Sequence, residues 1–165
     1  MDDQAVRDLL DEFVARVRES LSDSVVSIIL YGSVARGNAT VDSDIDVLVV
    51  LEEAPSVYHE RLRPFMPVLR QLRARPGSGV ANAGNTQAPI SLLVLSRAEA
   101  NQNRPLYLDM LDDARMLFDR DGFFARRLDI LRGRLEELGA RKLRRGDRWY
   151  WDLKPDLKPD EVLVL

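Results

Sequence analysis

Apolar residues along this chain follow two periods, one typical of helices and one typical of buried strands. Residues 3–21 place apolar side chains three or four positions apart, which predicts an amphipathic helix. Three short runs, 25–31, 44–51 and 90–95, are almost continuously apolar and predict strands buried on both faces. Residues 34–37, between the first two strands, predict a short helix.

Helical patterns dominate the segments between and after these strands. Residues 57–73 have a helical pattern that contains Pro64 and Pro67, so we expect a kink or two short helices there. Ser96 with Glu99 three residues later is typical of a capping box, which predicts the start of a helix. The remaining expected elements are a loop at 75–88, helices at 105–114 and 123–139, and a short strand at 116–118.

The two C-terminal segments 148–153 and 161–165 have strand character and are separated by a turn that contains proline. We expect them to pair as a terminal hairpin. The order of elements predicts an α/β (α+β) fold, in which helices flank a mixed β-sheet. We interpret residues 1–120 as a core domain and residues 121–165 as a helix and hairpin extension that packs on the same domain.

Length and composition fit one globular domain and exclude several classes of protein. The 165 residues are 45% apolar and 31% charged, which is not the composition of a disordered chain. The longest apolar runs are too short to span a bilayer, and the N-terminus has no pattern of a signal peptide. Cysteine is absent, which rules out disulfides and thiolate metal sites. We therefore expect a cytoplasmic protein without a membrane partner.

Charge is distributed unevenly along the chain. Residues 122–151 carry nine Lys/Arg and four Asp/Glu, a net charge of +5, so the remainder carries −8. This basic segment ends in Trp149, Tyr150 and Trp151, and strand alternation places the two tryptophans on one face. Two interpretations are open: the segment binds an RNA or another acidic partner, or it is a solvated helix face followed by tryptophans packed on the core. We favour packing.

Gly32 and Ser33 lie where the first strand meets the short helix, and they form the first half of a candidate site. Glycine lets the backbone approach a ligand closely, and free N–H groups at the start of a helix suit a phosphate. The Ser33 hydroxyl adds a donor, and Arg36 lies one turn further along the chain. Alone, the Gly-Ser pair is more typical of an ordinary turn with an N-cap.

Asp44 and Asp46 form the second half, at the start of the next strand. Their spacing of two puts both carboxylates on one face. Like charges held side by side are unfavourable without a cation, and Mg²⁺ prefers oxygen ligands such as carboxylates and phosphates. The simpler alternative is a solvated strand end.

Together these residues resemble the signature of the minimal nucleotidyltransferases of the DNA polymerase-β superfamily. That signature is Gly-Ser, ten residues, then Asp-x-Asp, and ten residues separate Ser33 from Asp44 here. The resemblance implies a nucleotidyltransferase fold in which Gly32, Ser33 and Arg36 bind ATP or another NTP. It also implies that Asp44 and Asp46 are the catalytic residues and ligate one or two Mg²⁺ ions. A nucleoside monophosphate, expected to be AMP, would pass to a hydroxyl group of an acceptor.

The chain departs from the family at one position. A third carboxylate is usual on the strand after the next helix, whereas Ser91 is the one polar residue inside the matching run here. We therefore keep an alternative: a binding or regulatory module that retains the nucleotide site without the chemistry. The resemblance implies a role as the antitoxin of a toxin–antitoxin pair, with a HEPN-type toxin as protein acceptor; an RNA acceptor is the less favoured option.

Overall fold

The computed structural model describes residues 3–40, 43–73, 90–146 and 148–158. Its centre is a four-stranded sheet in the order β3-β2-β1-β4. Strand β2 is antiparallel to β1 and parallel to β3, while β1 is also antiparallel to β4, so the sheet is mixed as expected. The strands are β1 (Val25–Tyr31), β2 (Ile45–Leu51), β3 (Ile90–Ser96) and β4 (Arg115–Asp119).

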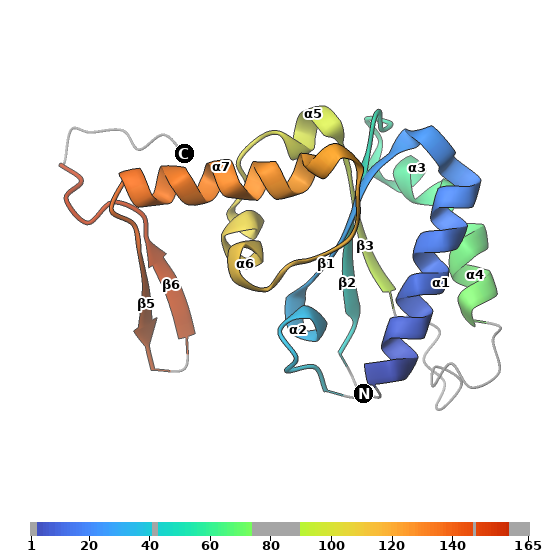
Figure 1. Ribbon diagram of the computed structural model, residues 1–165, viewed down its shortest axis with the longest axis horizontal. Coiled ribbons are helices and arrows are strands. Elements are labelled where there is room, and N and C mark those ends of the chain that lie inside the picture. The colour runs from blue at the N-terminus through green and yellow to red at the C-terminus, as the bar shows by residue number, and fades with distance from the viewer. Residues whose placement is uncertain (1–2, 41–42, 74–89, 147, 159–165) are drawn as a thin grey trace.

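Helices cover both faces of this sheet (Figure 1). Helix α1 and helix α4 lie over one face, and α6 and α7 lie over the other. The helices are α1 (Asp3–Leu21), α2 (Gly32–Ala35), α3 (Tyr58–Leu62), α4 (Met66–Arg73), α5 (Arg97–Ala100), α6 (Pro105–Asp113) and α7 (Phe123–Glu137), with 3₁₀ turns at Ser22–Ser24, Arg63–Phe65 and Arg120–Gly122. No helix among the described residues is both long and apolar enough to cross a membrane.

Side chains of β2 alternate between two hydrophobic clusters, one on each face of the sheet. The odd-numbered residues of Ile45–Leu51 lie in the cluster with α1 and α4, whereas Leu48 and Val50 lie in the cluster with α6 and α7. Because successive side chains of a strand point to opposite faces, Asp46 is on the α6 side. The packing of the core therefore decides which helix faces the candidate site.

The structure confirms most elements and corrects two. Helix α2 begins at Gly32, two residues before the expected start, because the glycine's positive φ already turns the chain there. Strand β6 (Arg148–Asp152) pairs with β5 (Arg141–Arg145). The sequence pattern predicts no strand at β5, because four of its five residues are charged and show no apolar alternation. The expected partner 161–165 and the expected loop at 75–88 lie outside the described residues. The division of the chain at residue 120 stays a prediction.

A buried arginine ties α3 to β3 and α5. The Arg61 guanidinium binds both carboxylate oxygens of Glu99, at 2.7 and 3.0 Å, and also donates to the carbonyl oxygens of Pro55 and Val94. Glu99 is at the same time the acceptor of the capping box that Ser96 begins. Hydrogen bonding from Arg61, despite partial desolvation, lowers the pKa of Glu99 from 4.5 to about 2. This ion pair fixes β3 against the helices that precede and follow it.

We expect Glu99→Gln to lower the free energy of unfolding at pH 7 by about 2 kcal/mol, because Arg61 would stay buried without its charged partner. Since the folded-state pKa is depressed, this contribution is present above pH 4.5 and is lost as the pH falls toward 2. Urea unfolding between pH 7 and 3 measures it. The exposed pair of Glu52 and Arg97 is the control, and Glu52→Gln should change stability by less than about 1 kcal/mol. Equal effects of the two variants would contradict this account.

Candidate functional site

The turn after β1 brings the chain against Asp46. Gly32 has φ +75°, a conformation that residues with a Cβ rarely adopt. A Cβ added to Gly32 would overlap Oδ2 of Asp46 and lie 3.0 Å from its Cγ. Two constraints therefore require glycine at position 32: the positive φ and the carboxylate that a Cβ would overlap.

Strand pairing explains why these two positions meet. In the antiparallel register of β1 and β2, Tyr31 lies opposite Asp46, so the residue after Tyr31 reaches the start of β2. Asp44 immediately precedes β2 and is exposed, while Asp46 is half-buried. The structure thus brings together Gly32 and Asp46, which are separated by 13 intervening positions in the sequence. The two halves of the site predicted from the sequence are therefore adjacent in space.

The two aspartates repel each other across this site. Burial raises the pKa of Asp46, the charge of Asp44 raises it further, and Arg36 lowers it. A half-buried carboxylate with a raised pKa beside a second carboxylate is a set of hard oxygen ligands without enough positive charge. The donor set therefore fits a divalent cation such as Mg²⁺, which takes carboxylate and phosphate oxygens.

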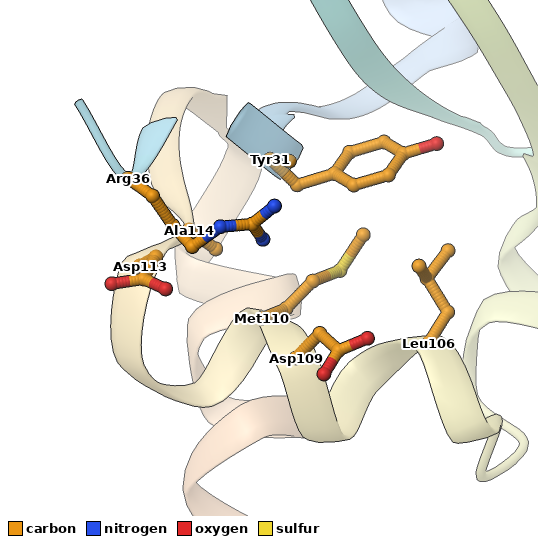
Figure 2. Close-up of a pocket in the computed structure, with 8 residues that line it drawn as sticks. Tyr31, Arg36, Leu106, Asp109, Met110, Asp113 and Ala114 are labelled. Carbon is orange, nitrogen blue, oxygen red and sulfur yellow. The ribbon is translucent and has the colours of Figure 1, made fainter. Parts of the chain in front are cut away.

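Arg36 and helix α6 enclose a pocket beside Gly32. The pocket has a volume of 170 Å³, and the Arg36 side chain extends into the space between Tyr31 and Met110 (Figure 2). The α6 side consists of Leu106, Asp109, Met110, Asp113 and the following Ala114. The pocket is thus apolar in the middle, with a cation at one side and carboxylates along α6.

Sequence reasoning missed the contribution of α6. Leu106, Asp109, Met110 and Asp113 are three or four residues apart, so they share one face of the helix. That spacing is a signal visible in the sequence, because two acids on a face with Leu and Met are unusual for a core helix. What the sequence could not show is that this face lies opposite Gly32 and Arg36.

Ser91 occupies the position where a third carboxylate was expected. It lies opposite Asp46 in the parallel register of β2 and β3, and it shares the α6 face with Leu93 and Leu95. Within the described part of the chain, no group of three or more Asp, Glu, His or Cys residues can hold a metal ion. Among the described residues, the carboxylates that could hold a cation here are therefore the two of Asp44 and Asp46.

The phenol of Tyr31 borders Asp46, and a second phenol, Tyr58, lies near Tyr31. Burial raises the pKa of Tyr31, and the charges of Asp46 and of Tyr58 raise it further. Tyr58 donates a hydrogen bond from its hydroxyl to the carbonyl oxygen of Leu92, at 3.0 Å. At neutral pH the Tyr31 hydroxyl therefore keeps its proton and is a donor, so it does not replace a missing carboxylate as a base.

Comparison with known proteins agrees with this geometry. Residues 10–78 match the family model described as the nucleotidyltransferase domain, a stretch that includes Gly32, Ser33, Arg36, Asp44 and Asp46. A Methanocaldococcus jannaschii protein named "Putative protein adenylyltransferase MJ1305" is 27% identical over 132 residues, which are 80% of this chain and 84% of the relative. A second protein of that organism, with the same description and the designation MJ0141, is 36% identical over 50 residues, 30% of this chain and 50% of the relative.

Two solved structures show a weaker likeness. One is described as a toxin-antitoxin with AMP-PNP, with a TM-score of 0.47, 13% identity and coverage of 84% of this chain and 94% of that one. The other is described as a tri-AMPylated Shewanella oneidensis HEPN toxin in complex with MNT antitoxin, with a TM-score of 0.43, 12% identity and coverage of 80% and 92%. Residues 10–78 are thus similar to a nucleotidyltransferase domain, and 80% of the chain is similar to the first M. jannaschii relative.

Proposed function

We propose that this protein transfers AMP from ATP to a hydroxyl group of a protein, with Mg²⁺ held by Asp44 and Asp46. The observation that carries the proposal is the contact between Gly32 and the Asp46 carboxylate. It places the backbone that would hold phosphates directly beside the residues that would hold the cation. A turn or a solvated strand end alone would not need that contact.

The residues of the turn have separate roles in binding the triphosphate. The first N–H groups of a helix have no partner within the helix, so those of Gly32 and Ser33 can donate to phosphate oxygens. The Ser33 hydroxyl adds a donor. The Arg36 guanidinium, which already lowers the pKa of Asp46, supplies the positive charge on the other side.

The pocket beside Arg36 offers apolar surface to the base of the substrate. Tyr31, Leu106 and Met110 offer flat and flexible apolar surfaces, and Asp109 offers a hydrogen-bond acceptor. When bound at the aspartates, Mg²⁺ would neutralise phosphate charge and polarise the α-phosphate. In the transfer, an acceptor oxygen bonds to the α-phosphorus, the bond to the bridging oxygen breaks, pyrophosphate leaves, and the hydroxyl proton goes to solvent.

The names of the two M. jannaschii relatives support a protein as the acceptor, since both are described as protein adenylyltransferases. A HEPN-type toxin remains the specific protein acceptor that the family resemblance implies. An RNA acceptor is less favoured, because the body of the protein is acidic and would repel a polyanion. Cytoplasmic location stays a prediction.

A second candidate function is a nucleotide-binding module that does not turn over. Ser91 favours it, because serine is a poor base and the described residues supply no third carboxylate. Incubation of the protein with labelled ATP and Mg²⁺ separates the two functions: the enzyme releases pyrophosphate in the presence of its acceptor, whereas the module binds ATP and releases none.

Asp46→Asn should weaken Mg²⁺-dependent ATP binding at least about tenfold, because the phosphates would lose a shared cation. The melting temperature should stay equal or rise, since the raised pKa of Asp46 means that its charge is unfavourable in the folded protein. Calorimetry and thermal unfolding give the two values. Asp11→Asn, an exposed acid on α1, should change neither. An unchanged ATP affinity for Asp46→Asn would remove the metal site from the proposal.

Gly32→Ala and Gly37→Ala form a matched pair. Both glycines have positive φ, near +75°, so both alanines should destabilise the fold by about 1–2 kcal/mol. Only Gly32 has a carboxylate where the Cβ would be, while nothing lies within 4 Å of a Cβ at Gly37. We therefore expect loss of ATP binding in Gly32→Ala and nearly native binding in Gly37→Ala, both measured by calorimetry. Equal losses would show that backbone strain alone is responsible.

Ser91→Asp tests whether the missing carboxylate limits the reaction. The new acid would lie opposite Asp46 on the same face of the sheet, so turnover should rise about tenfold or more while ATP affinity changes little. Ser91→Ala is the control and should leave turnover unchanged. A Ser91→Asp protein that binds ATP but gains no activity would indicate that another group already fills this role.

A further inference from the structure

The β5–β6 hairpin carries a concentrated positive charge on an acidic protein. Residues 141–152 contain five Lys/Arg and two Asp, a net charge of +3, so the rest of the chain carries −6. The hairpin is a separate two-stranded sheet and forms no part of the central one. In Figure 1 it projects from the end of α7, on the far side of α6 from the central sheet.

One face of this hairpin is built from tryptophans and cations. Lys142 lies opposite Trp151 and Arg144 lies opposite Trp149 in the strand register. The Arg144 guanidinium is 5.7 Å and the Lys142 ammonium 5.9 Å from the centre of the Trp149 ring. These cation–π contacts hold an aromatic side chain in one orientation before any partner arrives.

The two tryptophans of this face have different surroundings. Trp151 packs against the cluster of α6 and α7, and its Nε1 is buried. Trp149, two residues nearer the tip, is 59% exposed. The expectation that both tryptophans pack on the core is therefore wrong for Trp149. Trp151 packs the hairpin onto the fold, whereas Trp149 stays exposed. An exposed tryptophan adds little to the stability of the fold and is typical of protein–protein interfaces.

The same face is turned toward α6. Lys142 forms an ion pair with Asp112, and Trp151 packs in the cluster that contains Met110. Met110 also lines the pocket beside Gly32. The end of the hairpin that carries Lys142 and Trp151 thus contacts the helix that forms one side of the candidate site.

We propose that the hairpin face formed by Lys142, Arg144 and Trp149 docks the protein acceptor through an acidic patch on the acceptor's surface. This inference rests on the proposed transfer to a protein. Charge complementarity selects the partner: the hairpin is basic, whereas α6 exposes Asp109 and also Asp112, which is paired with Lys142. A nucleic acid that ran from the hairpin to the site would carry its negative charge past these carboxylates. A folded protein presents an acidic patch to the hairpin and a different surface to α6.

The test uses the full chain and three labelled probes: a glutamate-rich peptide that contains serine, its glutamine counterpart and a single-stranded oligoribonucleotide. We expect the glutamate peptide to bind about tenfold more tightly than the glutamine peptide at low salt. Both tryptophans of the chain lie on β6, so intrinsic fluorescence reports whether the complex forms at the hairpin. Failure of the glutamate peptide to bind, or tighter binding of the oligoribonucleotide, would overturn the proposal.

Variants locate the binding surface. Trp149→Ala and Arg144→Glu should each weaken binding of the glutamate peptide about tenfold, and Trp149→Phe should weaken it less. Arg7→Glu, the same charge change on exposed α1, is the control and should stay within about twofold. The melting temperatures check that every variant folds. Native affinity in both Trp149→Ala and Arg144→Glu would overturn the docking surface.

ATP binding separates this inference from the proposed function. Calorimetry should give the same ATP affinity for the hairpin variants as for the native protein, since none of these residues lines the pocket. If the native protein fails to bind ATP while peptide binding depends on Trp149 and Arg144, the nucleotide-transfer proposal falls and the docking surface stands. If labelled AMP reaches the peptide equally well in native and hairpin variants, the docking surface falls and the transfer stands.

Discussion

The close approach of the β1 turn to the start of β2 is the constraint on which the site depends. Gly32 can adopt its positive φ and leave room for the Asp46 carboxylate because it lacks a Cβ. The antiparallel register that pairs Tyr31 with Asp46 puts the two there. Strand alternation then directs the acid to the α6 side, where Arg36 and the pocket lie. Backbone geometry, strand pairing and core packing together bring Gly32 and Asp46 into contact.

The charges at this site are arranged differently from those of the buried ion pair between Arg61 and Glu99. Within the site, Asp44 and Asp46 repel each other and are only partly compensated by Arg36. The buried pair of Arg61 and Glu99 is the contrasting case, because each charge there has an opposite charge as its partner. The ion pair lowers the pKa of Glu99, whereas burial and the charge of Asp44 raise the pKa of Asp46, which is the direction expected of a carboxylate without enough positive charge around it.

The sequence was sufficient for elements whose local pattern matches their final environment. The apolar runs of β1 and β2, the capping box at Ser96 and the spacing of Asp44 and Asp46 all depend on neighbours within a few residues. The pocket wall on α6 could not be predicted, because it depends on which helix packs opposite the turn. Strand β5 was missed for a different reason: its residues are mostly exposed, and the tryptophans beside them come from β6, so the strand has no apolar alternation of its own.

If the site binds a cation and a nucleotide as proposed, the repulsion between Asp44 and Asp46 also makes the stability of the protein depend on that ligand. A protein that bears an unfavourable charge pair is less stable alone than with a bound cation and nucleotide, and a ligand at a hundred times its dissociation constant adds about 2.7 kcal/mol. This free energy lowers the population of unfolded chains, which proteases can attack, about a hundredfold. The cellular half-life of such a protein would therefore follow the supply of its own substrate.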